Sequence, residues 1–179
     1  MSENTELKIE GLLKEQKVLV SSLQDIKGLT ERGYGVLEDA TLLLNACEAL
    51  FLLSKGLLEV KSGDKKKNLN FEELLQHFQK FEEDIWVKYL IYRDLRSRGY
   101  VVREGFGLGI DFRLYERGEY GKETATYVVY GILEGKPVKI EHLIRTLKHV
   151  QNLKKKLILA VINRRGEIVY YSLSELTVK

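Results

Sequence analysis

Alternating hydrophobic and polar positions in the first part of the chain predict two short strands followed by a helix. Residues 6–20 alternate with the period of a strand around a polar turn at 14–16. The two serines at 21–22 are residues that commonly cap helices, and the pattern after them predicts a helix over 23–31. Gly33 is expected to end this helix.

A second helix is predicted to begin near Asp39 or Thr41 and to end before Gly56. Its apolar residues recur at spacings of three and four and so share one helix face: Leu43, Ala46, Cys47, Leu50 and Phe51. This segment is therefore expected to pack against the core.

A strand over 57–60 and a solvated loop over 61–68, with consecutive lysines at 65–67, are predicted next. Asn70 and Glu73 have the spacing of a capping box, in which each residue bonds the other's backbone N–H at the start of a helix. A helix is therefore expected to follow Asn70.

The clearest helical pattern of the chain ends at Gly99. Four apolar residues form a stripe along it: Ile85, Tyr89, Tyr92 and Leu95. Arginines gather in its last turns, where a positive charge suits the negative end of the helix dipole.

After Gly99, β-branched and aromatic residues dominate and predict a sheet. Strands are expected over 100–102, 110–115, 124–132, 157–162 and 168–173, with one helix over 140–153. The glycines at 105, 107 and 109 predict a tight loop. The sequence therefore predicts an α+β fold, with a small N-terminal α+β domain over 1–80 and a C-terminal α/β domain with a central mixed sheet over 81–179.

The composition indicates the cellular environment of the protein but says little about its function. Cys47 is the only cysteine, so no disulfide can form within the chain, and we expect a reducing, cytoplasmic location. Its apolar neighbours predict a buried thiol. No stretch is long and apolar enough to span a membrane, and the first residues lack the features of a signal peptide. The net charge of +3 permits a nucleic-acid partner without indicating one.

Motifs for metal or cofactor chemistry are weak. His77, His142 and His149 have neither the spacing nor the acidic or cysteine neighbours of a metal site, so each is expected at the surface or its rim. The glycines over 105–109 are not followed by a helical pattern, which excludes the dinucleotide fingerprint. We expect no metal and no cofactor.

The strand over 110–115 is the most informative segment. Alternation places Asp111, Arg113 and Tyr115 on one face, and Tyr115 stands at the strand end before a glycine turn. By itself this predicts a polar strand face, with a functional site as the alternative. The lysines at 154–156 likewise predict a solvated basic corner, with phosphate contact as the alternative.

These segments resemble the archaeal tRNA-splicing endonucleases. The helix-to-strand unit over 88–102 is similar to the unit that opens the family's catalytic domain, and 107–115 is similar to its K-Y-G-A-D-F-x-x-Y signature. Residues 155–161 resemble the R-K-x-L-I-x-A segment. In the N-terminal half the resemblance is carried by 32–35, 48–53 and 56–60. It implies an endonuclease-like C-terminal domain.

The resemblance also implies an activity: metal-independent cleavage of precursor tRNA at bulge-helix-bulge junctions, leaving a 2′,3′-cyclic phosphate and a 5′-hydroxyl. The family's general base, a tyrosine, corresponds to Tyr115, and its charge-stabilising lysine to Lys155. The position of its general acid, a histidine, is held by Thr124. A threonine hydroxyl cannot donate a proton near neutral pH as imidazolium does.

A second departure concerns RNA contact. Lys148 stands where the family has an arginine that clamps a bulged base, and lysine lacks the planar guanidinium that stacks on a purine. The expected RNA contacts are Lys148, Lys154, Lys156 and Arg113. Four hypotheses stay open: a structural subunit, which we favour; an active subunit with His149 or water as the acid; a deliberately altered residue at Thr124; and an RNA-binding module outside the family.

The resemblance implies an assembly as well. The family pairs subunits through its last strand, here 167–173, where Ile168, Tyr170 and Tyr171 are expected to form an apolar edge. The family also inserts an acidic loop into a partner, but the loop at 133–137 has one acid and a lysine and is not expected to insert. It is expected instead to belong to the subunit that receives such a loop. The expected partners are precursor tRNA and either a catalytic paralogous subunit, in a heterotetramer, or further copies of this chain, in a homotetramer.

Overall fold

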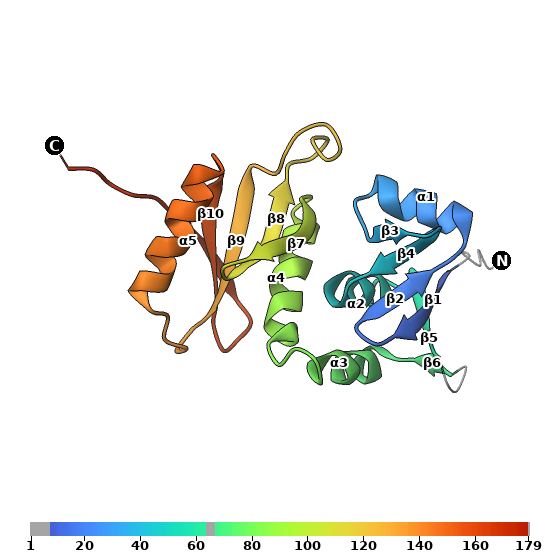
Figure 1. Cartoon of the computed structure of the whole chain (residues 1–179). Coiled ribbons are helices and arrows are strands. Elements are labelled where there is room, and N and C mark those ends of the chain that lie inside the picture. The colour runs from blue at the N-terminus through green and yellow to red at the C-terminus, as the bar shows by residue number, and fades with distance from the viewer. Residues whose placement is uncertain (1–7, 64–66, 179) are drawn as a thin grey trace, which may run out of the picture. The chain divides into compact units, whose positions relative to one another are not determined.

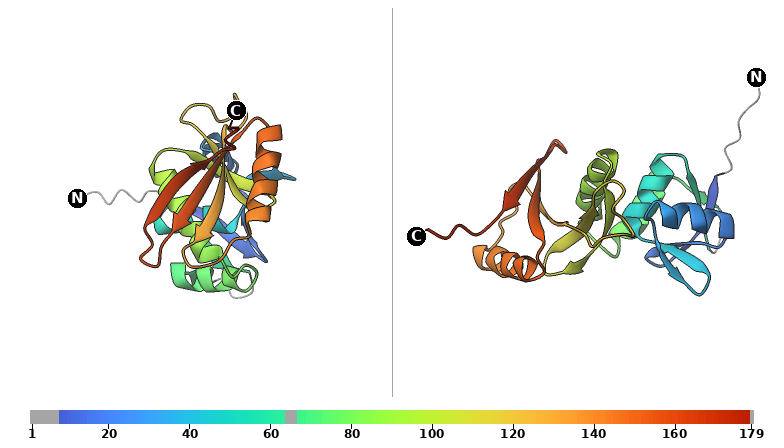
Figure 2. Two further views of the ribbon diagram at one scale, coloured as in Figure 1. Left: turned by 90° about the vertical axis from the view of Figure 1, so that its left-hand side faces the viewer. Right: turned by 90° about the horizontal axis from the view of Figure 1, so that it is seen from above.

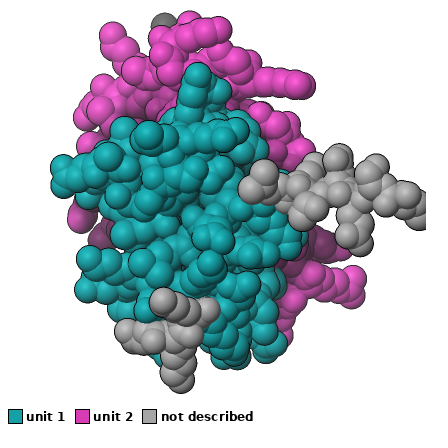
Figure 3. Space-filling model, turned by 90° about the vertical axis from the view of Figure 1, so that its right-hand side faces the viewer, with its two compact units in different colours: residues 1–89 teal, residues 90–179 magenta. Residues whose placement is uncertain are grey.

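The computed structural model describes residues 8–63 and 67–178, and these fall into two compact units that divide between Tyr89 and Leu90 (Figures 1 and 3). Helix α4 (Ile85–Ser97) runs across the division in sequence. None of the helices in the described ranges is long and apolar enough to cross a membrane.

The first unit is a six-stranded mixed sheet with three helices. Its strands are β1 (Ile9–Lys14), β2 (Lys17–Val20), β3 (Val36–Glu38), β4 (Thr41–Leu44), β5 (Leu58–Ser62) and β6 (Asn68–Leu69), and its helices are α1 (Leu23–Glu31), α2 (Ala46–Ser54) and α3 (Phe71–Gln79). The strand order is β3-β4-β2-β1-β5-β6, and only β1 and β5 run parallel.

Alternate residues of these strands form the core of the first unit. Val18, Val20, Leu42, Leu44 and Val60 are fully buried, and β2 and β5 contact α2, six of whose nine residues are buried. Cys47 lies in this helix and is buried, as its apolar neighbours predict. Strands β2 and β4 bury alternate residues, and so do the first residues of β1 and β5, so this part of the sheet has one apolar face and one that meets solvent.

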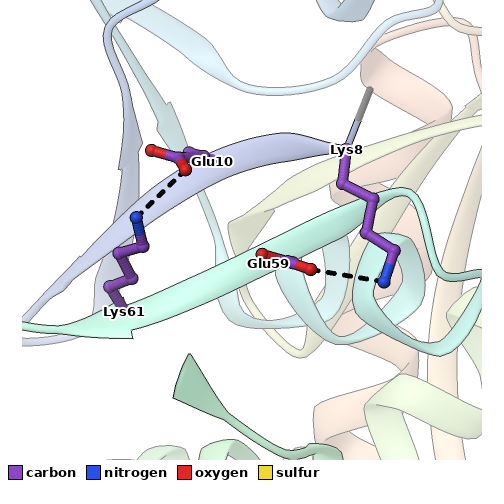
Figure 4. Close-up of polar contacts among 4 residues, drawn as sticks. All are labelled: Lys8, Glu10, Glu59 and Lys61. Carbon is purple, nitrogen blue, oxygen red and sulfur yellow. Dashed lines mark hydrogen bonds and ion pairs between the residues drawn. The ribbon is translucent and has the colours of Figure 1, made fainter. Parts of the chain in front are cut away.

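On the solvent face, Glu10 and Glu59 lie directly opposite each other on the parallel strands β1 and β5. Two lysines on the diagonal offset this repulsion: Lys61 pairs with Glu10 at 3.0 Å and Lys8 with Glu59 at 3.3 Å (Figure 4). Such exposed pairs contribute at most about 1 kcal/mol each. Their main effect is to permit two acids in one cross-strand position.

Two predictions in the first unit were wrong in part. The helix expected from Asp39 or Thr41 begins only at Ala46, where Asn45 and Glu48 form a capping box. The residues before it form the β3–β4 hairpin, whose turn residues Asp39 and Ala40 both have positive φ, as a type I′ turn requires. Neither is glycine, so the usual turn signal is missing.

The loop predicted over 61–68 is shorter than expected. Lys61 and Ser62 belong to β5, and Asn68 belongs to β6. Of the three lysines at 65–67, Lys65 and Lys66 lie outside the described residues. The helix expected after Asn70 is confirmed, with the Asn70–Glu73 capping box formed.

The second unit is a five-stranded mixed sheet with one long helix of its own. Its elements after α4 are β7 (Val101–Gly107), β8 (Ile110–Tyr115), β9 (Tyr127–Leu133), α5 (Ile140–Asn152), β10 (Lys156–Ile162) and β11 (Ile168–Leu173). The order is β11-β10-β9-β8-β7, and only β9 and β10 run parallel, joined by α5 (Figure 2). The predicted mixed α+β class is confirmed.

Helices cover both faces of this sheet. A cluster around Val128, Tyr130, Val150 and Leu157 joins β9 and β10 to α5. On the opposite face, the rings of Tyr92 in α4 and Phe112 in β8 lie 5.8 Å apart.

Two boundaries differ from the prediction in the second unit. Strand β7 continues through Gly107, with a register shift between Glu104 and Gly107, so the tight loop is confined to Leu108 and Gly109. A side chain at Gly105 would meet the carbonyl oxygen of Ile110 at 2.0 Å, so glycine here permits close strand approach. The strand expected from residue 124 begins at Tyr127.

Candidate functional site

Strand β8 ends, and strands β9 and β10 begin, at the same end of the second sheet. This group of strand ends is called the strand edge below. Leu114 of β8 pairs with Tyr127 of β9, and Tyr127 pairs with Lys156 of β10. Continuing this register by one residue places Tyr115 and Lys155 in one row, on the opposite face from Leu114. With neighbouring strands about 4.8 Å apart, their backbones lie roughly 10 Å from each other across β9.

Tyr115 is the last residue of β8 and is half-buried. The alternation predicted for this strand is confirmed, because Phe112 and Leu114 are buried while Arg113 and Tyr115 are partly exposed. The ring of Tyr115 packs edge to face with that of Tyr120, with ring centres 5.2 Å apart. The polar face of β8 therefore ends in an aromatic pair.

Lys155 lies between the end of α5 and the start of β10. Its backbone N–H donates to the carbonyl of Val150 at 3.1 Å, which closes the last turn of the helix. Its side-chain Nζ donates to the carbonyl oxygen of Ala125 at 2.5 Å. The cation is thus held beside the segment that leads into β9.

Thr124 is exposed and directly precedes Ala125 in this segment. The hydrogen bond from Lys155 to Ala125 therefore keeps Thr124 next to the lysine. The structure brings Tyr115, Thr124 and Lys155 to one edge of one sheet. A phenol and a cation are present there, and the third position offers only an aliphatic hydroxyl, which is a poor proton donor at neutral pH.

The four cations expected to contact RNA do not share one surface. Arg113 lies on the face of Tyr115, and its Nε donates to the carbonyl oxygen of Glu104 at 2.9 Å. Lys156 lies on the opposite face, with its Nζ 5.8 Å from the ring centre of Tyr127. Lys148 and Lys154 are exposed on and just after α5.

Each of the three histidines contacts a residue other than Tyr115, Thr124 and Lys155. The His149 ring packs on Phe106, with centres 5.8 Å apart, near the hairpin tip at the opposite end of β8 from Tyr115. His142 contacts the hydroxyl of Tyr130 at 3.1 Å, and His77 contacts the carbonyl of Glu15 at 2.6 Å. Within residues 8–63 and 67–178, no three His, Cys, Asp or Glu residues are grouped as a metal site would need.

A hollow of about 300 Å³ adjoins Lys155 on its α5 side. Its lining combines apolar and polar groups: Leu147, Gln151, Lys155, Lys156, Leu157, Ser172, Leu173 and Ser174. Lys155 therefore borders both the loop that carries Thr124 and a recess between α5 and β11.

Two residues of this edge escaped the sequence prediction. Tyr120 contacts Tyr115, and the guanidinium of Arg103 lies 5.9 Å from the centre of the Tyr120 ring. Alternation in β7 could have placed Arg103 opposite Arg113, with which it pairs. Tyr120 had no such signal, because it lies in an irregular loop.

The predicted apolar edge of β11 needs a correction. Strand β11 is an edge strand, but its residues divide between two faces. Val169 and Tyr171 are 52% and 53% exposed on one face. On the other, the Tyr170 hydroxyl donates to Asp94 of α4 at 2.7 Å, and burial together with this carboxylate raises the pKa of the phenol far above its usual value. Tyr170 therefore links β11 to α4 within the second unit.

Comparison with known protein families finds two matches that together span most of the chain. The sequence model of the tRNA intron endonuclease N-terminal domain matches residues 9–75. That of the tRNA intron endonuclease catalytic C-terminal domain matches residues 85–170, which include the strand edge described above.

Curated archaeal proteins are similar over most of their length. The tRNA-splicing endonuclease of Methanococcus maripaludis is 34% identical over 168 residues, covering 94% of this chain and 94% of that protein. That of Pyrococcus furiosus is 34% identical over 140 residues, covering 78% and 79%. That of Methanothermobacter thermautotrophicus is 32% identical over 168 residues, covering 92% and 96%.

Proposed function

The chain belongs to the tRNA intron endonuclease family, and we propose from this that it is a subunit of a tRNA-splicing endonuclease whose own catalytic site is incomplete. The observation that carries the proposal is the arrangement of Tyr115, Thr124 and Lys155 at one strand edge. Two of the three groups needed for cleavage are present, and the third is a threonine.

The proposed reaction is attack of a ribose 2′-hydroxyl on the adjacent phosphorus at a bulge-helix-bulge junction. The phenolate form of Tyr115 would take the 2′-hydroxyl proton and become a phenol, and the ammonium group of Lys155 would stabilise the negative charge on the pentacoordinate phosphate. The P–O5′ bond breaks as the new P–O2′ bond forms, which yields a cyclic phosphate. The departing 5′-oxygen requires a proton, and general acid catalysis of this kind contributes about 10²–10⁴-fold.

Thr124 cannot supply that proton at neutral pH, which favours a structural role for this subunit. The structure offers no support for His149 as a replacement, because its ring packs on Phe106 near the hairpin tip. In the proposed complex, a paralogous subunit with a histidine performs the cleavage. This chain completes the assembly and holds precursor tRNA through the cations near its strand edge, among them Lys148, Lys154 and Arg113.

The proposal includes an assembly and a location. We propose a heterotetramer with a catalytic paralogue, in which β11 pairs with a second subunit through its exposed edge. A homotetramer of this chain is the alternative arrangement. The single, buried cysteine agrees with a cytoplasmic location.

Substitution of Thr124 tests the proposal directly. The purified chain, Thr124→His and the matched control Thr124→Asn are each incubated with a bulge-helix-bulge RNA. We expect little cleavage by the unchanged chain and by Thr124→Asn, and a gain of about 10²-fold or more in Thr124→His, since only imidazole restores a proton donor. Efficient cleavage by the unchanged chain alone would overturn the incomplete-site proposal.

A second arm tests the subunit role. A histidine-bearing paralogue is mixed with this chain, and cleavage is measured for each alone and for the mixture. Cleavage that requires both chains supports the structural role. A paralogue that is fully active alone and whose rate this chain leaves unchanged contradicts it.

A further inference from the structure

We propose that Tyr120 and Arg103 position the phenol of Tyr115 for the cleavage reaction. The inference rests on the proposed function, in which Tyr115 is the general base. Neither residue belongs to the three positions identified from the family resemblance. Both are linked to Tyr115 by contacts within the second unit.

The first contact is between two rings. The planes of Tyr115 and Tyr120 are inclined at 85°, with ring centres 5.2 Å apart. This is the edge-to-face geometry that aromatic pairs favour, because the positive edge of one ring meets the negative face of the other. Tyr115 stands at a strand end and is partly exposed, so without this neighbour its side chain would have several rotamers open to it.

The loop that carries Tyr120 is folded by its own backbone. The N–H of Glu119 donates to the carbonyl of Glu116 at 3.1 Å, and the N–H groups of Lys122 and Glu123 donate to the carbonyl of Glu119 at 3.0 and 3.1 Å. Positive φ values of 85° and 83° at Gly118 and Gly121 allow the chain to turn back on either side. Tyr120 is thus presented to Tyr115 by an ordered turn.

Arg103 supports Tyr120 from the sheet. It pairs with Arg113 on the neighbouring strand, two residues from the Val101–Tyr115 pair, so its side chain leaves the same face as Tyr115. Its guanidinium lies 5.9 Å from the Tyr120 ring centre, a distance at which a cation and an aromatic ring attract each other. The result is a series of contacts from β7, through the loop, to the end of β8.

This arrangement predicts an effect on turnover more than on RNA binding. A base that must remove a proton in the transition state gains rate when its side chain is held in the reactive orientation before the substrate arrives. An edge-to-face pair is expected to change kcat by roughly 2- to 10-fold. The KM for RNA should change little, because Tyr120 acts through Tyr115.

The kinetic test uses the full chain carrying Thr124→His, in which cleavage is expected. Tyr120→Leu and Arg103→Gln are compared with Tyr120→Phe, which keeps the ring, and with Phe81→Leu, which removes an exposed aromatic residue between α3 and α4. We expect kcat to fall for the first two at constant KM and to stay unchanged for Tyr120→Phe and Phe81→Leu. A rise in KM alone would overturn the positioning role.

A spectroscopic test needs no cleavage. In the full chain with ¹³C-labelled tyrosine, the ring signals of Tyr115 are expected to shift and to average in Tyr120→Leu and to stay in place in Phe81→Leu. Unchanged Tyr115 signals in Tyr120→Leu would overturn the inference. If Thr124→His does not cleave RNA while these signals shift, the proposed function fails and the contact between the two tyrosines stands.

Discussion

Lys155 and Ala125 are joined by a hydrogen bond of 2.5 Å from the lysine Nζ to the alanine carbonyl oxygen. Ala125 is itself buried, whereas Thr124 before it is exposed. The bond therefore anchors the loop at the point where it enters β9 and holds a positive charge at the residue that follows Thr124. One side chain thus affects both the charge of the site and the path of the loop.

Replacing Lys155 should abolish the activity that Thr124→His confers. In that background, Lys155→Met is expected to lower kcat by about 10²–10³-fold, because a fixed donor to the developing phosphate charge is lost. The measurement is single-turnover cleavage of a bulge-helix-bulge RNA. Lys139→Met, an exposed lysine at the start of α5, serves as the control and should cleave at the parent rate. Equal rates for both variants would contradict a role for Lys155.

The tie between Tyr170 and Asp94 should contribute to stability. Tyr170→Phe removes the hydroxyl that donates to Asp94 at 2.7 Å and leaves the carboxylate with one partner fewer. The expected loss in the free energy of unfolding is about 1–2 kcal/mol, measured by urea denaturation near pH 7. Tyr171→Phe, the exposed neighbour in β11, should change it by less than about 0.5 kcal/mol.

The same tie predicts a pH dependence. Burial and Asp94 raise the pKa of Tyr170 in the folded protein, so the folded state keeps the phenol protonated after the unfolded chain has begun to ionise. The contribution to stability is therefore complete below about pH 10, the usual tyrosine value, and is lost as the pH rises above it. The unfolding free energy of the parent should fall more steeply between pH 9 and 11 than that of Tyr170→Phe. Parallel curves would contradict this.

Two capping boxes provide a matched pair for a second stability test. The buried carboxylate of Glu48 accepts the N–H of Asn45 at 3.0 Å and, through its other oxygen, the N–H of Gly35 at 3.1 Å. Glu48→Ala removes both acceptors inside the core and is expected to cost about 2–4 kcal/mol in unfolding free energy.

Glu73 is the control for this substitution. It makes the same capping box with Asn70 at the start of α3, but at the protein surface, where water can replace the lost bonds. Glu73→Ala should therefore destabilise the protein clearly less than Glu48→Ala in the same denaturation experiment. Equal losses would show that burial of Glu48 is unimportant.

Most elements could be predicted from the sequence where one periodicity dominates. The stripe of α4 and the alternation of β8 follow from burial of one face, and the Asn70–Glu73 spacing marks the start of α3. The start of α2 could not be predicted in this way. Asp39 and Ala40 form a hairpin turn without glycine, and the apolar residues of β4 satisfied both a strand and a helix pattern.

The same distinction applies to the candidate site, whose residues could be identified from the sequence although their spatial arrangement could not. The sequence alone determined which side chains are available: a tyrosine at a strand end, a lysine before a buried strand, and a threonine at the position where the family resemblance predicts an acid. Only the tertiary structure decided that Tyr115, Thr124 and Lys155 lie at the same strand ends, that Tyr120 packs on Tyr115, and that Tyr170 bonds Asp94 of α4. The physical reason is that the periodic pattern of buried residues is a local property of the sequence. Strand order and register, by contrast, arise from pairing between segments that are distant in the chain.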